Sequence, residues 1–239
     1  MELIKISHRK EEIVIMAYDY STLTKYDLNI KELRNHVLQN QFDFKYYDEW
    51  INGWMNVFIN AEIDTLTQIQ NLERNGVPLF EVFVKEISFG NADFKFNFIV
   101  EGAKNYIKNS KATPKKIPVS EFLKKVMWTE EETESSHEIN DPVYLTTLPT
   151  GNKMYLLIDG NKRVSQLLRS GANEIKYFDI SAEDIIEQQI LLFTIEKAMY
   201  AFLIETYTFQ QHLKRGRYTH KDIFESSNIF KAFKALNIK

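Results

Sequence analysis

The stretch LIDGNKRVSQLLRSG, residues 157–171, decides the fold that the sequence predicts. It opens with an apolar pair, which Asp159-Gly160-Asn161 interrupts with turn-forming residues. Gly171 closes the stretch, and glycine commonly ends a helix. We therefore expect a strand that ends at Asp159, a tight loop, and an amphipathic helix that opens at Lys162. Apolar residues recur at helical spacing within that helix, at Val164, Leu167 and Leu168.

The flanking residues extend this pattern on both sides. Val143–Thr147 and Met154–Ile158 read as two strands, joined by a turn at Pro149–Asn152 in which Gly151 can adopt a positive φ. Glu174–Ile180 reads as a third strand. The predicted order is hairpin, loop, helix and strand, which forms a small α/β module.

The loop carries residue types that bind anions. A helix N-terminus offers unpaired N–H groups and the positive end of the helix dipole. Gly160 allows a ligand to approach the backbone closely, and Lys162 and Arg163 add positive charge. Asp159 holds the shape of the loop or helps to place a cation. The candidate phosphate-binding residues are Asp159, Gly160, Asn161, Lys162 and Arg163.

Two further expectations concern this loop. The guanidinium of Arg163 can form bidentate hydrogen bonds with a phosphate group, and we expect its side chain to point into solvent while the site is empty. The alternative is that Asp-Gly-Asn is an ordinary turn and Lys-Arg a solvated pair.

These residues give the chain a resemblance to the ParB/sulfiredoxin superfamily. The family pattern is a strand, Asp-Gly-x-x-Arg, an amphipathic helix, Gly and a strand, which here runs from Leu157 to Phe178. Lys116–Phe122 resembles the opening strand and turn of that domain, so the resemblance covers residues 113–182. It implies a ParB/Srx-like α/β module that binds nucleotide phosphates through the loop, with Mg²⁺ and CTP or ATP as the expected cofactors.

The chain also departs from members of that superfamily. Its sulfinic acid reductases need a loop cysteine, where this chain has Asn161 and no cysteine at all. Its partition proteins carry a proline-arginine motif and a helix-turn-helix that this chain does not show, and many relatives have His or Arg in place of Lys162. The resemblance therefore supports a shared fold more strongly than it supports any one activity of the superfamily.

Fic/Doc transferases are a rival resemblance, because Asp-Gly-Asn-Lys-Arg also forms their anion-binding loop. Those enzymes need a histidine four residues before the aspartate, where this chain has Tyr155. Their loop also follows a different element from the strand expected here.

Three functions follow from the superfamily resemblance. The first is a nucleotide-binding phosphohydrolase, phosphotransferase or switch that uses CTP or ATP. The second is a DNA-associated protein, either a nuclease or a regulator of a partition system or mobile element, in which Lys214, Arg215 and Arg217 contact backbone phosphates. The third is a non-catalytic member of the fold. The sequence assigns no catalytic residues and no metal ligands.

Composition limits these functions further. The 239 residues suit one large domain or two smaller ones. Along the chain we expect an N-terminal mixed α/β region (1–112), the ParB/Srx-like domain (113–182) and a C-terminal helical region (183–239). The fold class expected for the whole chain is α+β. The absence of cysteine excludes disulfides and thiol catalysis, and a net charge of −3 argues against bulk attraction to nucleic acid.

Nothing in the sequence indicates a membrane. The N-terminus has no signal-peptide pattern, and the apolar stretch Ile185–Thr206 carries charges that are costly in lipid. We therefore expect a cytoplasmic protein in which Ser181 caps one buried helix through Ile185–Tyr207. This C-terminal region, with a final helix at Lys221–Leu236, is the candidate surface for a homo-oligomer.

The N-terminal region is predicted to contribute its own core. We expect a strand at residues 11–18, a helix that Asn29 caps and that runs to Gln39, a helix from Asp48 to Arg74 and a half-buried strand at residues 92–99. The polar stretch Lys108–Lys116 is the candidate domain boundary. The core residues predicted on the second helix are Trp50, Trp54, Phe58 and Leu66.

The acidic segment 127–141, which includes His137, is predicted to form an exposed loop or a lid. His137 has no partner at metal-ligand spacing in the sequence. We therefore interpret it as a surface histidine.

Overall fold

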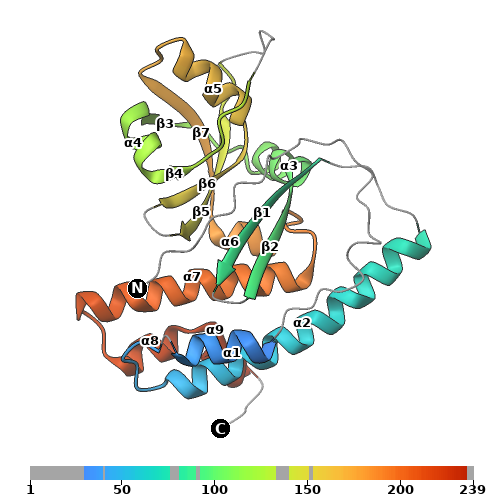
Figure 1. Ribbon diagram of the computed structural model, residues 1–239, viewed down its shortest axis with the longest axis vertical. Coiled ribbons are helices and arrows are strands. Elements are labelled where there is room, and N and C mark those ends of the chain that lie inside the picture. The colour runs from blue at the N-terminus through green and yellow to red at the C-terminus, as the bar shows by residue number, and fades with distance from the viewer. Residues whose placement is uncertain are drawn as a thin grey trace.

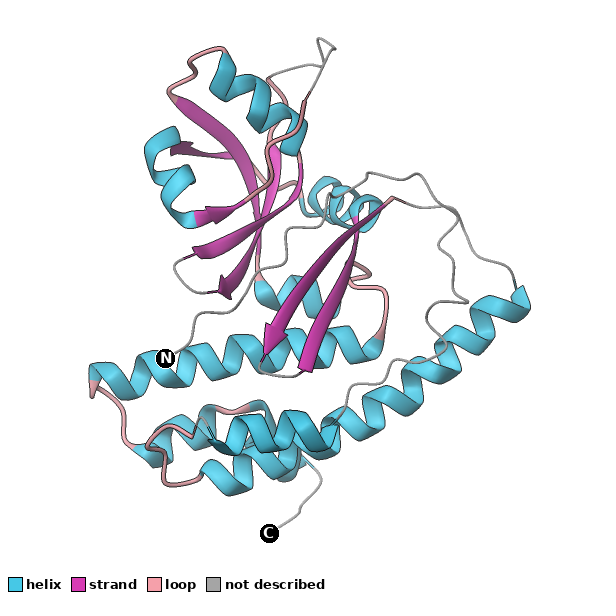
Figure 2. Ribbon diagram, in the orientation of Figure 1, coloured by secondary structure: helices cyan, strands magenta, loops and turns pink. Residues whose placement is uncertain are grey.

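The computed structural model describes residues 30–39, 41–75, 81–89, 92–132, 140–150 and 153–235, and shows an α+β fold (Figures 1 and 2). The helices are α1 Ile30–Gln39, α2 Tyr47–Asn75, α3 Val100–Ser110, α4 Val119–Lys125, α5 Asn161–Arg169, α6 Ala182–Glu187, α7 Thr194–Arg215, α8 His220–Ser226 and α9 Asn228–Ala235. The strands are β1 Val82–Phe89, β2 Ala92–Ile99, β3 Lys115–Pro118, β4 Val126–Met127, β5 Val143–Thr150, β6 Lys153–Asp159 and β7 Glu174–Ile180.

A mixed five-stranded sheet contains the predicted hairpin and the predicted third strand, and the predicted loop and helix connect them. Its order is β3-β7-β5-β6-β4. The strand β5 runs antiparallel to β6 and parallel to β7. Tyr144 on β5 pairs with Asp159 on one side and Phe178 on the other, so the end of β6 lies beside the beginning of β5. The hairpin, the helix and the third strand are confirmed.

The two faces of this sheet belong to different cores, because side chains alternate along a strand. Leu157 faces a small core that also contains Val164 of α5 and Phe122 of α4. Its neighbours Leu156 and Ile158 face the larger core. That core also contains side chains of α2, β2 and α7, so elements from both ends of the described chain share it.

The strand β2 is buried on its phenylalanine face as expected, and its other face is more covered than a half-buried strand would be. Phe94, Phe96 and Phe98 are buried as predicted, but the side chain of Asn97 is fully buried as well. It donates a hydrogen bond to the carboxylate of Glu196, which satisfies its polarity.

The predicted helix through Ile185–Tyr207 is wrong, because α6 ends at Glu187 and α7 begins only at Thr194. The intervening backbone pairs with β2 instead. The Ile99 amide donates to the Ile190 carbonyl at 2.7 Å, and the Leu192 amide donates to the Asn97 carbonyl at 3.2 Å. These β-type hydrogen bonds replace the helical ones over that stretch.

Capping decides where several of these C-terminal helices begin. Ser181 caps α6 as predicted, since its side chain accepts from the Asp184 amide at 3.1 Å. The predicted final helix is interrupted at Ser227, which is buried and accepts from the Phe230 amide at 2.9 Å. Over the described ranges, no helix is long and apolar enough to cross a membrane.

Most of the predicted core of α2 is confirmed. Trp50, Trp54 and Phe58 are at most 2% exposed, and they pack on α7 through Phe202. Leu66 is 40% exposed, so its assignment to the core is wrong. Among the described residues, the buried side chains of α2 lie on the side that faces α7, and Leu66 lies away from that side.

Several predictions fall on residues that the structure does not describe. These are the strand at 11–18, the cap at Asn29, the positive φ at Gly151 and the surface assignment of His137. The segment 127–141 is described up to residue 132 and again from residue 140.

Candidate functional site

The loop at the end of β6 has the predicted local structure. Asp159 ends the strand, Gly160 adopts a φ of +113° and a ψ of 21°, and α5 begins at Asn161, one residue before Lys162. A strand at residues 153–159 precedes the loop, so the element order differs from that of the Fic/Doc loop.

Gly160 is required by the protein itself. A φ of +113° is strained for a residue with a side chain, and a Cβ at this position would lie 2.6 Å from Val143 Cγ1. The close packing of Gly160 against β5 therefore explains the glycine without any ligand.

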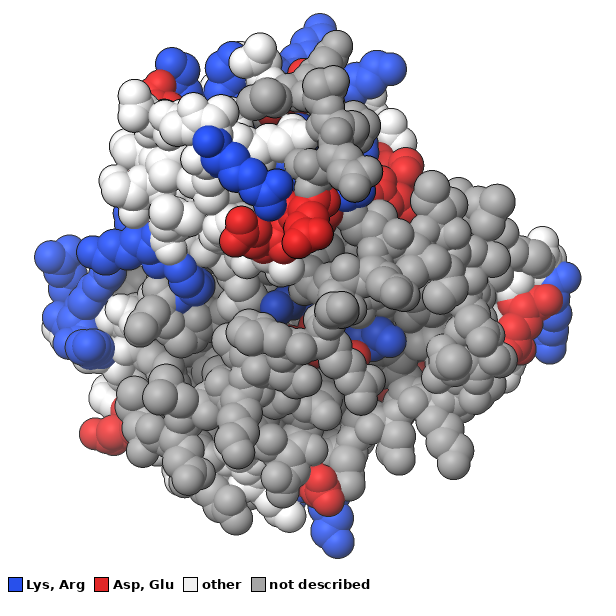
Figure 3. All heavy atoms as spheres, turned by 45° about the horizontal axis from the view of Figure 1, so that its top comes forward, with Lys and Arg blue, Asp and Glu red and all other residues white. Residues whose placement is uncertain are grey.

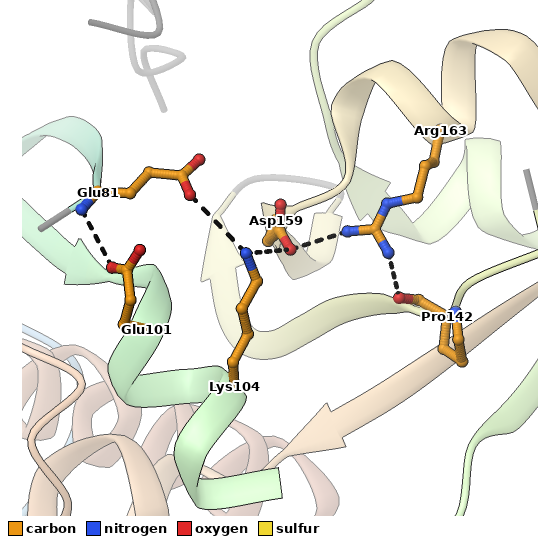
Figure 4. A network of polar contacts seen from close by, with 6 residues as sticks. All are labelled: Glu81, Glu101, Lys104, Pro142, Asp159 and Arg163. Atoms are coloured by element: carbon orange, nitrogen blue, oxygen red, sulfur yellow. Dashed lines mark hydrogen bonds and ion pairs between the residues drawn. The ribbon is translucent and has the colours of Figure 1, made fainter. Parts of the chain in front are cut away.

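Arg163 does not point into solvent, and that expectation is wrong. Its Nη2 donates to Asp159 Oδ2 at 2.8 Å, and its Nη1 donates to the Pro142 carbonyl at 2.5 Å (Figure 4). Both charged side chains are only 17% exposed. Arg163 therefore connects the start of α5 to the end of β6 and to the residue that precedes β5.

Lys104 of α3 joins this group, and sequence reasoning missed it. Its Nζ lies 3.6 Å from Asp159 Oδ2 and 3.8 Å from Glu81 Oε2. Figure 4 shows Lys104 between the two carboxylates, with the Glu81 amide donating to Glu101. Because Lys104 and Asp159 come from distant segments, only the tertiary fold brings them together.

Burial acts on the ionisable groups near this network. It raises the pKa of the Glu81 carboxyl, and Lys104 partly opposes that shift. Burial likewise raises the pKa of the Tyr144 phenol, and the negative charge of Asp159 acts in the same direction. The network is thus an alternating chain of carboxylates and cations that partly neutralises itself.

Asn161 faces the protein instead of a ligand. Its side chain is buried, and its Oδ1 accepts from the Thr129 amide at 2.9 Å. One turn later, Ser165 Oγ accepts from the Glu131 amide at 2.9 Å, and Arg169 donates to the Glu131 carbonyl at the same distance. The described start of the acidic segment is therefore bound along α5, so this part is not a free loop.

The groups left for an anion are at the first turn of α5. The first helical hydrogen bond runs from the Val164 amide to the Gly160 carbonyl at 2.9 Å. The amides of Asn161, Lys162 and Arg163 precede that bond and have no helical acceptor. The Lys162 side chain is exposed and forms no ion pair with any described residue. The described loop therefore offers an anion three backbone amides and one ammonium group.

The predicted DNA-contacting residues lie far from this loop in the fold. Lys214 and Arg215 end α7, Gly216 caps it with a φ of +62°, and Arg217 follows. All three cationic side chains are exposed. Figure 3 shows basic side chains gathered at the left edge of the face drawn, where acidic ones are few.

The described part of the chain contains no cluster of three histidine, aspartate or glutamate side chains that would hold a metal ion. Comparisons with known protein families, with curated proteins and with solved structures found no match to this chain.

Proposed function

We propose that the loop Asp159–Arg163 binds the phosphate groups of a nucleotide, and that residues 113–182 are a ParB/Srx-like nucleotide-binding module. The observation that carries the proposal is the first turn of α5. It presents three amides without helical acceptors beside the exposed ammonium of Lys162. A strand, a glycine in the left-handed region and a helix deliver these groups to one place.

The remaining loop residues would support this binding. Arg163 holds the loop in shape through Asp159 and Pro142, so its role is to position the amides. Asp159 uses Oδ2 for both Arg163 and Lys104, and its other oxygen is the candidate ligand for Mg²⁺. Mg²⁺ in nucleotide sites is commonly held by one or two carboxylates together with the phosphates.

The proposed activity is hydrolysis or transfer of phosphate from CTP or ATP, or a switch between nucleotide states. No catalytic residue is assigned, because no described residue of the loop pairs a nucleophilic side chain with a general base. A cytoplasmic location is part of the same proposal, because these nucleotides are found there.

A DNA-associated function is the second candidate. The exposed cations Lys214, Arg215 and Arg217 at the end of α7 favour it, since such groups neutralise backbone phosphates. A member of the fold without either activity is the third candidate.

A thermal-shift screen of nucleoside triphosphates, with and without Mg²⁺, tests the first candidate. A ligand at about 100 times its dissociation constant stabilises the folded state by about 2.7 kcal/mol. Stabilisation with turnover supports the enzyme, and stabilisation without turnover supports a switch. Salt-dependent retention on DNA supports the second candidate, and a chain with neither response is the third.

A further inference from the structure

A cavity of about 750 Å³ opens between α2, α6, α7 and α9. In Figure 1, α2, α7 and α9 lie at the opposite end of the molecule from α5. Pockets that bind small organic molecules measure about 300–1,000 Å³, so this volume suits such a ligand. Most of the wall is apolar, with Val57, Ala61, Ile186, Ala201, Ile204 and Ile229 among its residues.

One carboxylate on this wall is buried, and no cation among the described residues pairs with it. Glu205 is 7% exposed, and its Oε1 accepts from the indoles of Trp50 at 2.6 Å and Trp54 at 2.9 Å. Its Oε2 accepts from the Asn228 amide at 2.8 Å. All of these donors are neutral, and no ion pair links Glu205 to a described Lys or Arg. A carboxylate has about four acceptor sites, so Oε2 keeps one for another donor.

The rest of the charged lining is also mainly acidic. Asp64, Glu183 and Glu187 are exposed at the cavity, whereas Lys197 is the cation among the lining residues. Within the described ranges, none of these four forms an ion pair. A cavity lined mainly by one sign of charge attracts ligands of the opposite sign.

We propose that this cavity binds a small organic cation with an apolar body. The ammonium group would lie near Glu205, donate to its remaining acceptor site and supply a counter-charge that no described Lys or Arg supplies. The apolar body would bury the aliphatic side chains of Val57, Ile204 and Ile229. The cavity and the loop Asp159–Arg163 have no residue in common, so this proposal and the proposed nucleotide binding are independent of each other.

Octylammonium, used below the concentration at which it forms micelles, is a suitable probe, and octanoate is its anionic counterpart of equal length. The chain has three tryptophans. A Trp128→Phe background therefore leaves only Trp50 and Trp54, which contact Glu205, to report binding. We expect octylammonium to change the fluorescence of these tryptophans saturably, with a matching calorimetric heat, and octanoate to bind at least tenfold more weakly.

Two variants and one control link the signal to the cavity. Ala201→Phe places an aromatic ring in the cavity and should weaken octylammonium binding at least tenfold. The double variant Asp64→Asn/Glu187→Gln removes two rim charges and should weaken binding about twofold or more, since each exposed charge contact contributes modestly. Glu73→Gln removes an exposed acid of α2 outside the lining and should leave binding unchanged.

Three results would overturn the proposal. They are no saturable binding of octylammonium at millimolar concentration, equal binding of octanoate, and binding that neither variant weakens. If Ala201→Phe unfolds, the double variant decides, because Asp64 and Glu187 are exposed and their substitution leaves the core intact. Tight binding of a basic amphipathic peptide without binding of octylammonium would likewise contradict a small-molecule site.

Discussion

Replacing Arg163 by alanine should destabilise the fold, because the guanidinium is a structural connection in the structure. It donates to Asp159 at 2.8 Å and to the Pro142 carbonyl at 2.5 Å, and it is only 17% exposed. A hydrogen bond that involves a charged group contributes about 1.5–3 kcal/mol. Lys104 stays 3.6 Å from Asp159 and compensates for part of the loss.

We therefore expect Arg163→Ala to lower the free energy of unfolding by about 2–3 kcal/mol, a fall of about 4–12 °C in the melting temperature for a chain of this size. Urea unfolding followed by circular dichroism measures this change. Arg169→Ala is the matched control, since Arg169 is 45% exposed and its loss should cost less than about 1 kcal/mol.

A double-mutant cycle with Asp159→Ala isolates the ion pair. We expect a coupling energy of about 1–2 kcal/mol between Arg163 and Asp159. A loss below about 0.5 kcal/mol in Arg163→Ala, with no coupling in the cycle, would refute the structural role of Arg163.

Three further predictions concern the fold. Gly160→Val should cost more than about 2 kcal/mol, because the new Cβ lies 2.6 Å from a β5 side chain and φ is +113°; an unchanged urea midpoint would contradict this. Trp54→Ala should cost about 3–5 kcal/mol, whereas Leu66→Ala, at a 40% exposed position, should cost less than about 1 kcal/mol; equal losses in thermal unfolding would show that the two burial assignments are wrong. A hydrogen bond to Asp184, with smaller effects of burial and of the Asp184 charge, raises the pKa of Tyr106 to about 12 from its usual 10.0. The stability that the protonated phenol contributes is therefore present below pH 10 and is lost as pH rises towards 12. Tyr106→Phe should flatten the fall in stability between pH 10 and 12, and an identical pH profile for wild type and variant would argue against the bond.

Local patterns predicted the elements around the loop, because neighbouring residues determine them. Asp159 and Gly160 interrupt an apolar run, and no strand pairing overrides the helical pattern that follows them. The end of the strand and the beginning of α5 were therefore predictable to within one residue.

Tertiary contacts determine the features that local sequence patterns did not predict. The apolar run around Ile190 has helical spacing, but its backbone pairs with β2, and this pairing breaks the predicted helix. Leu66 fits the helical pattern of α2, yet it is 40% exposed, because no described element packs on that side of the helix closely enough to bury it. Lys104 reaches Asp159 from another segment, and no local pattern marks such a contact.

Calorimetric titration of the wild type and of Lys162→Ala with CTP, ATP and GTP, each with Mg²⁺, tests the central claim most directly. Lys162 is exposed, so its loss should spare the fold and weaken nucleotide binding by about tenfold, the effect of one charge-assisted hydrogen bond. Lys176→Ala, which removes another exposed lysine, should bind as the wild type does. The account predicts a saturable heat for the wild type with at least one nucleotide. No heat with any of them at millimolar concentration, or equal affinity in Lys162→Ala, would contradict it.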